Sequence, residues 1–392
     1  MKIPRLDVMI YAHDGRGLGH ASRSAAIGMA LRRLDPQLRV LLVSGCKQTA
    51  TLIDNAPLDW IKLPAYETTV INGKSTGVAG HSNYSDIQLG HLRGEMIRAL
   101  VARHRPRVVL ADHTPQGKHR ELLPALKTSR SVNSRWLLGV RGIVGQVSQI
   151  ASPLAKTTFQ NHYHGLLWYG DRRILGGGPP AELQVRFGIE PVETGYVCRL
   201  AELVHWRVGP QPSQPKFAGT ISVPWLGEKS RPLVHTLGQT LNNLGDAHGT
   251  WRIFIAGGDH DTCGMIEATF EKLPSCRVSP VGPDYADALL YSKLALIYGG
   301  YNSLTDVLWS RRPAVVLVRE MQDSEQLLHL ERLQQHLGAG LRVIPETGLT
   351  AETLANAIEN QLRSPPLTTE TIGLAGAERA ARHLMALIQA DA

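Results

Sequence analysis

The sequence predicts an α/β protein built from two doubly wound parallel sheets, and three observations support this prediction. Short, continuous apolar runs alternate with amphipathic stretches along most of the chain. The alternation breaks clearly once, at 201–220, where three prolines and the lack of a period indicate a linker. The chain has 392 residues, 43% of them hydrophobic, which suits two packed cores better than one.

The first half contains the elements of one such sheet. Apolar strands are expected at 6–12, 39–45, 105–113, 135–142 and 165–170, and an amphipathic helix at 20–34. Continuous apolar strands separated by helices are typical of a parallel sheet that is covered on both faces. Crossovers of this kind are right-handed, so residues 1–200 are expected to form a Rossmann-like domain.

The second half repeats this order of elements. Strands are expected at 220–226, 251–258, 276–282, 294–300 and 313–320, with a helix near 231–245. Residues 201–375 are therefore predicted to form a second Rossmann-like domain. Residues 376–392 are predicted to be a helix that packs back on the first domain. The polar, glycine-rich stretch 67–95 is expected to be a long loop, either a surface loop or a grip for an acceptor.

The composition excludes several classes of protein. The formal net charge of +8 favours an anionic partner, such as a nucleotide phosphate, a nucleic acid or an acidic membrane face. Lys and Arg are dispersed rather than clustered with aromatics, which argues against nucleic acid. The four cysteines form no CxxC pair, so neither a zinc site nor a disulfide framework is indicated. The chain has no signal peptide and no long apolar run, so we expect a cytoplasmic protein, with peripheral contact to the inner membrane face left open.

A glycine-rich turn follows the first predicted strand, in "AHDGRGLGHASRS". Such a turn lets the backbone approach a ligand closely, and the helix after it offers unpaired N–H groups. The spacing matches neither a P-loop nor a dinucleotide fingerprint. His20 stands at the start of the helix, where a neutral imidazole can take a proton from a hydroxyl; the alternative is a capping or packing residue.

A second candidate site follows the strand 294–300, in "GGYNSLTDVLWSRRPAVVLVREMQDSEQ". A helix is expected to start near Asn302 or Ser303, with one of them as its cap, and its N-terminus can hold a diphosphate without a metal. Asp306, one turn into this helix, is placed to accept hydrogen bonds from ribose hydroxyls. The alternative is a well-capped crossover helix with a charged surface.

These two motifs resemble those of GT-B glycosyltransferases. The likeness is greatest to predicted bacterial enzymes related to the peptidoglycan N-acetylglucosaminyltransferase. That group carries a Gly-Gly-Tyr-Asn-Thr turn, a Glu in the helix, and an Arg followed six residues later by Glu-Gln. Here the matching stretch is "GGYNS", with Asp306 in place of the Glu. "GLGHASR" is similar to the group's N-terminal motif, and "ETGYV" (193–197) to its domain junction.

The resemblance implies two facing domains with a nucleoside-diphosphate sugar, expected to be a UDP-sugar, held mainly by the second. Transfer to a hydroxyl acceptor would invert the anomeric carbon without a metal or further cofactor. Position by position, the resemblance makes His20 the general base. It assigns donor binding to Gly19, Gly299, Gly300, Tyr301, Asn302, Ser303, Asp306, Arg319, Glu325 and Gln326. Within this set, residues 301–303 are expected to bind the phosphates, Asp306 the ribose, and residues 325–326 the sugar hydroxyls. The acceptor side comprises His13, Asp14, Arg16 and Arg141.

Two related activities stay open. Nucleotide-sugar hydrolases of the pseudaminic acid pathway type have a similar opening motif and use water as the acceptor. A non-hydrolysing UDP-N-acetylglucosamine 2-epimerase shares the fold but needs a carboxylate-rich cleft, which the sequence does not indicate. The long 67–95 stretch favours a bulky acceptor, and therefore transfer over hydrolysis.

Overall fold

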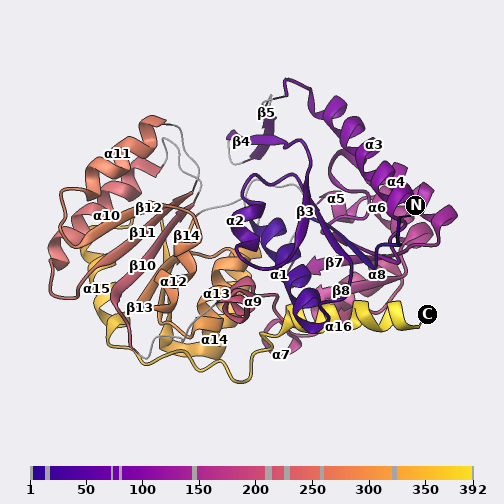
Figure 1. The fold of residues 1–392 in the computed structure, drawn as a ribbon. Helices are drawn as coiled ribbons and strands as arrows, with labels where there is room; N and C mark the ends of the chain where they lie inside the picture. The colour runs from indigo at the N-terminus through magenta and orange to yellow at the C-terminus, as the bar shows by residue number, and fades with distance from the viewer. Residues whose placement is uncertain are drawn as a thin grey trace. The chain divides into compact units, whose positions relative to one another are not determined.

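A computed structural model describes most of the chain. The described residues are 3–13, 18–71, 74–78, 82–143, 148–207, 214–224, 230–256, 260–319 and 325–390. The chain divides into two compact units: unit 1 contains Met1–Arg207 and Ile372–Ala392, and unit 2 contains Val208–Thr371. Each unit has its own parallel sheet with flanking helices (Figure 1), which confirms the predicted fold class of two Rossmann-like doubly wound domains.

The sheet of unit 1 has seven parallel strands in the order β3-β2-β1-β6-β7-β8-β9. Their bounds are β1 Val8–Tyr11, β2 Val40–Ser44, β3 Asp59–Lys62, β6 Val108–Asp112, β7 Arg135–Arg141, β8 Gly165–Tyr169 and β9 Val192–Glu193. The central strands β1 and β6 are buried along their whole length, as their continuous apolar sequences predict. They are direct neighbours, with Val8 opposite Val108 and Tyr11 opposite Ala111.

Helices cover this sheet. Their bounds are α1 Gly19–Leu34, α2 Thr49–Ile53, α3 Asp86–His104, α4 Leu123–Val132, α5 Ser148–Ala151, α6 Pro153–His162, α7 Arg172–Leu175, α8 Gly178–Phe187 and α9 Arg199–Trp206, with a short 3-10 turn η1 Lys118–Arg120. Ser85 and Gln88 form a capping box that starts α3. Helix α1 packs against α2 and α9, and α3 packs against α4.

The stretch 67–95 is not one long loop, contrary to the prediction. It contains an antiparallel hairpin of β4 Glu67–Ile71 and β5 Lys74–Val78, and α3 begins at Asp86. The expected linker is also partly structured: α9 occupies its first residues, and β10 starts at Phe217. Because α9 packs on α1, unit 1 continues to Arg207.

The end of the chain returns to unit 1. Helix α16 (Gly376–Gln389) packs along α1. The backbone around the start of this helix is hydrogen-bonded to the "ETGYV" stretch. Tyr196 N–H donates to the Gly373 carbonyl at 2.7 Å, and Gly376 N–H donates to the Tyr196 carbonyl at 3.0 Å. A Cβ on Gly376 would lie 2.5 Å from backbone atoms of Tyr196, so only glycine allows this approach. Arg33 of α1 adds ion pairs to Glu202 of α9 and Glu378 of α16.

Unit 2 has a six-stranded parallel sheet in the order β12-β11-β10-β13-β14-β15. Its strands are β10 Phe217–Pro224, β11 Trp251–Ala256, β12 Cys276–Pro280, β13 Ser292–Tyr298, β14 Ala314–Val318 and β15 Leu341–Pro345. Its helices are α10 Arg231–Leu244, α11 His260–Phe270, α12 Asp284–Leu290, α13 Tyr301–Ser310, α14 Glu325–Leu337 and α15 Ala351–Leu362, with the 3-10 turn η3 Gly338–Gly340. Leu296 and Val315 of the central strands pack with Leu237 of α10 and Ile358 of α15 in its core.

Candidate active site

The first candidate site lies where the strand order of unit 1 reverses. The chain runs from β1 outward to β2 and β3, then returns to β6 on the other side of β1. At such a point the loops after the two central strands diverge, leaving a crevice at their carboxyl ends, where open α/β sheets bind ligands. Here β1 leads towards His20 at the start of α1, and β6 ends in Asp112, followed by His113.

His20 and Asp112 form a hydrogen-bonded pair across this point. The bond joins His20 Nδ1 to Asp112 Oδ2, and the Asp112 side chain is only 3% exposed. A carboxylate can only accept, so this contact assigns the proton to Nδ1 and the free lone pair to Nε2. Arg23 Nη2, which can only donate, lies 3.0 Å from the same Nδ1 and favours the other tautomer. Arg23 Nη2 lies 3.5 Å from the other oxygen of this carboxylate, Oδ1.

Two further imidazoles surround His20. The ring centroids of His13 and His113 lie 5.1 and 4.9 Å from that of His20, and 5.0 Å from each other. Burial lowers the pKa of all three imidazoles well below the usual value. For His20, the positive charges of Arg23, Arg141 and Lys118 lower the pKa further. The cluster is therefore neutral at pH 7, the state that a general base requires.

The loop after β6 is held in an unusual backbone conformation. His113, His119 and Arg120 have φ values of 78°, 50° and 66°, in the left-handed region that favours glycine. A bulky residue held there costs on the order of 1–3 kcal/mol and persists only when its surroundings enforce it. Among those surroundings, Tyr163 Oη donates to the Pro115 carbonyl at 2.7 Å, and His113 N–H donates to the Gly139 carbonyl at 2.8 Å.

Glu121 anchors the far end of this loop. Its carboxylate accepts two hydrogen bonds from Arg93 of α3, at 2.5 and 2.9 Å, and both side chains are fully buried. Tyr11, at the end of β1, and Tyr66 donate to the same carboxylate at 2.5 and 2.9 Å. Four donors therefore satisfy one buried charge, and they tie the ends of β1, α3 and the β6 loop together.

The structure brings two of the predicted acceptor-side residues to His20. His13 is in the imidazole cluster, and Arg141 ends β7, beside β6, close enough to influence His20 and His113 electrostatically. Gly19 is the first residue of α1. Asp14 and Arg16 lie outside the described residues.

Asp112 and His113 were not predicted to be site residues, although they end the predicted strand 105–113. Their role becomes visible only when the strand order places β6 beside β1.

The second candidate site occupies the equivalent point in unit 2. The strand order reverses between β10 and β13, and β13 leads through Gly299 and Gly300 into α13. The capping prediction was wrong: α13 begins at Tyr301, and Gly300 is its N-cap, without a side-chain hydrogen bond. Neither Asn302 nor Ser303 caps the helix, so its first N–H groups are left without a side-chain acceptor from the cap position.

The two glycines before α13 differ in their surroundings. A Cβ on Gly299 would lie 2.7 Å from Leu330 Cδ1, whereas a Cβ on Gly300 would meet no atom of the described residues within 4 Å. Gly299 is thus required by packing, and Gly300 borders open space at the helix N-terminus. Asn302 and Ser303 in the first turn are half-buried, Tyr301 is buried, and Asp306 is only 7% exposed.

Arg319, just after β14, already has protein partners. Its guanidinium donates to Glu346, with Nε at 2.7 Å and Nη2 at 3.3 Å, and Nη2 also lies 3.0 Å from Tyr298 Oη. All three residues follow or end neighbouring strands at the carboxyl edge of the sheet. Glu325 and Gln326 begin α14; the side chain of Glu325 lies outside the described part of the chain.

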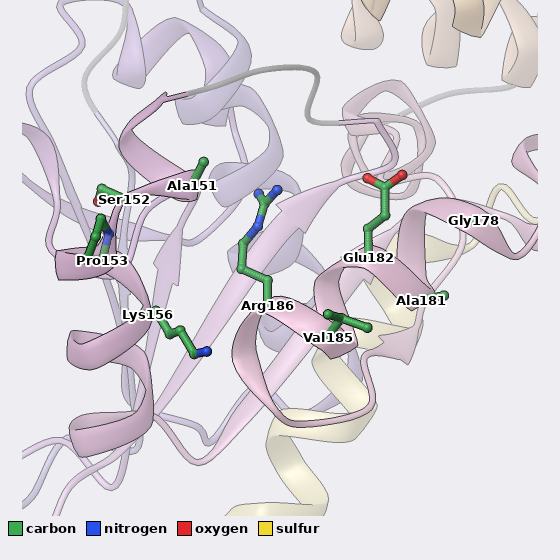
Figure 2. Close-up of a pocket in the computed structure, with 9 residues that line it drawn as sticks. All are labelled: Ala151, Ser152, Pro153, Lys156, Gly178, Ala181, Glu182, Val185 and Arg186. Carbon is green, nitrogen blue, oxygen red and sulfur yellow. The ribbon is translucent and has the colours of Figure 1, made fainter.

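Other features of the described residues bear on the class of site. They contain no group of three or more His, Cys, Asp or Glu arranged to hold a metal ion. None of the helices that could be searched combines the length and apolar character needed to cross a bilayer. An open groove of about 830 Å³ lies between α6 and α8 (Figure 2). No residue of the imidazole cluster and no predicted site residue lines it.

Comparisons with known proteins agree on the fold. No family model matches the sequence, and no curated protein is detectably similar. Among solved structures, the chain resembles Acinetobacter baumannii MurG at 16% identity and TM-score 0.53, with 99% of this chain and 100% of that one covered. A Listeria monocytogenes protein that carries the name of a UDP-N-acetylglucosamine 2-epimerase matches at 12% identity and TM-score 0.61, with coverages of 99% and 96%. Spinosyn rhamnosyltransferase SpnG complexed with thymidine diphosphate matches at 15% identity and TM-score 0.53, with 98% of this chain and 96% of that one covered. At these identities the likeness establishes the two-domain fold.

Proposed function

We propose that this chain is an inverting glycosyltransferase that moves a sugar from a nucleoside-diphosphate sugar, expected to be a UDP-sugar, to a hydroxyl acceptor. The observation that carries the proposal is the His20–Asp112 pair at the reversal point of unit 1, in which Asp112 is buried and His20 keeps 18% of its side chain exposed. A second reversal point, in unit 2, carries an uncapped helix N-terminus bordered by Gly300. The fold shared with MurG and SpnG supports the same activity.

In the proposed reaction His20 is the general base. Its Nε2 removes the proton from the acceptor hydroxyl as that oxygen attacks the anomeric carbon. The bond to the acceptor forms as the bond to the diphosphate breaks on the opposite face, so the configuration inverts. Asp112 holds the ring in the reactive tautomer and stabilises the imidazolium that forms. Neutral His13 and the cation Arg141 border the acceptor.

The donor is assigned to unit 2. Backbone N–H groups of the first turn of α13, at Tyr301, Asn302 and Ser303, would bind the diphosphate and stabilise its charge as it departs. Asp306 would bind the ribose, and Glu325 and Gln326 the sugar hydroxyls. Arg319 would act mainly by shaping the sheet edge, since Glu346 already neutralises its charge. The mechanism uses no metal or other cofactor.

The hydrolase and epimerase alternatives predict different products. The epimerase has support from the TM-score of 0.61. The carboxylates described at the crevice of unit 1 argue against it, since Asp112 is paired with His20 and Glu121 is enclosed by Arg93 and two tyrosines. Incubation with UDP-N-acetylglucosamine separates all three. Epimerisation releases no UDP, hydrolysis releases UDP and free sugar in water, and transfer releases UDP only when an acceptor is present.

The proposal is tested by a panel of nucleotide sugars in a thermal-shift assay. A ligand that binds only the folded state raises the melting temperature in proportion to ln(1 + [L]/Kd). Substitution His20→Ala is expected to abolish transfer while the donor still raises Tm. Asp306→Ala should weaken donor binding. Loss of both transfer and donor binding in His20→Ala would assign His20 a structural role, and unchanged donor affinity in Asp306→Ala would remove that residue from the site.

A further inference from the structure

His113 occupies a backbone position that few residues other than glycine adopt. Its φ of 78° is in the left-handed region, where glycine or asparagine is the relaxed choice. The conformation is fixed on both sides: His113 N–H donates to the Gly139 carbonyl, and Thr114 N–H donates to the Asp112 carbonyl at 3.1 Å. The fold therefore tolerates strain in order to place an imidazole directly after Asp112.

The ring of His113 is used for contact rather than for hydrogen bonding. The residue is 8% exposed, and its Nδ1 atom is buried with no hydrogen-bond partner among the described residues. The ring lies against two other rings, tilted by 55° to His20 and nearly perpendicular to His13. If the position served packing alone, an apolar side chain would fill it without leaving a buried polar atom unsatisfied.

We propose that His113 is a positioning residue, which covers His20 and holds its ring against Asp112 with water kept away. Consecutive residues at the end of β6 then act on the same imidazole in two ways, because Asp112 fixes His20 through its hydrogen bond and His113 fixes it by contact. The catalytic meaning of this arrangement rests on the proposed function, but the arrangement itself can be measured without a substrate.

Burial is the main cause of the lowered pKa of His20, and His113 contributes to that burial. The charged and titratable groups that face His20 are His13 after β1, Arg23 on α1, Asp112 and His113 at the end of β6, Lys118 in η1 and Arg141 at the end of β7. Removing the His113 ring leaves all the charged groups in place. Such a variant therefore tests only the burial of His20 by the His113 ring.

The test compares His113→Gly and His113→Asn with the unchanged full-length protein. The pKa of His20 is read by NMR titration of the imidazole signals, assigned from the signal that His20→Gln removes, and Tm is measured in parallel. We expect the pKa of His20 to rise most in the glycine variant and less in the asparagine variant, which keeps part of the cover. Tm should hold or rise, since both residues suit a φ of 78°.

A matched control is Asn133→Gly, which places a glycine at another left-handed position (φ 51°), the exposed C-cap of α4. It should leave the pKa of His20 unchanged. The proposal is overturned if the pKa of His20 is the same in the unchanged protein and both His113 variants, or if the control moves it equally. Absence of transfer in the unchanged protein, together with the expected pKa order, would instead refute the glycosyltransferase and leave the positioning role standing.

Discussion

Acid is expected to destabilise unit 1 through its three clustered imidazoles. His13, His20 and His113 have pKa values lowered by burial, so the folded unit leaves them neutral, whereas an unfolded histidine binds a proton below about pH 6.5. Over that window the unfolded chain holds more protons, so stability falls as the pH falls. Each group contributes about 1.4 kcal/mol per pH unit, and three contribute about 4 kcal/mol per pH unit at most. Stability is independent of these groups above the window.

The measurement is urea unfolding between about pH 5 and pH 8.5, a range that spans the ordinary titration of histidine. Unfolding is followed by tryptophan fluorescence, to which Trp136 and Trp168, fully buried in unit 1, contribute. Single variants His13→Asn and His113→Asn each remove one titrating group. Each should reduce the acid slope of the unfolding free energy by about 1.4 kcal/mol per pH unit. The control is the unfolding free energy about one pH unit above the histidine titration, where its slope with pH should be the same in every protein.

A slope that neither substitution changes would mean that these imidazoles bind protons equally in the folded and unfolded states. The neutral state of His13 and His113 in the folded protein would then be refuted.

Three further changes test other parts of the structure. Asp112→Asn should lower transfer by about 100-fold or more, because the reactive tautomer is no longer fixed, while donor affinity stays within about twofold by calorimetry. Glu121→Gln leaves the buried guanidinium of Arg93 without its counter-charge and should cost about 3–5 kcal/mol in urea unfolding; adding Arg93→Leu should recover part of this, and a further loss would contradict the account. Gly300→Ala should weaken nucleotide binding about tenfold at constant Tm, because its Cβ meets no described atom. Gly299→Ala should lower Tm, because its Cβ would overlap Leu330 and cost about 1–3 kcal/mol of unfolding free energy. Equal effects of the two substitutions on Tm would contradict the account.

The core strands could be predicted from the sequence because burial on both faces imposes continuous apolar runs. The predicted strands 39–45 and 135–142 match β2 and β7 to within one residue at each end. Strand β3 was missed because it is a half-exposed edge strand, with both ends exposed. The hairpin of β4 and β5 was missed although the Asn-Gly pair at 72–73 is a two-residue turn signal in the sequence; its polar strands give no apolar alternation.

The candidate site was predictable only where its signal is local in sequence. His20 follows a glycine-rich turn and opens a helix, which the sequence displays directly. Its partner Asp112 is 92 residues away, and only the strand order β1-β6 joins them. Arg319 was predicted to bind the donor; the carboxylate that pairs with it, Glu346, comes from the end of the next strand. Long-range pairing of this kind is set by topology and not by local pattern.

Unit 1 is assembled from both ends of the sequence, because residues 208–371 are inserted before its closing segment. During synthesis its sheet leaves the ribosome well before α16 does; at about 5–20 residues per second, the delay is on the order of ten seconds. Throughout that interval α1 lacks the helix that packs along it, and Arg33 lacks Glu378. Nascent chains halted before Gly376 should therefore bind chaperones through the uncovered face of α1, and release them once the last helix docks.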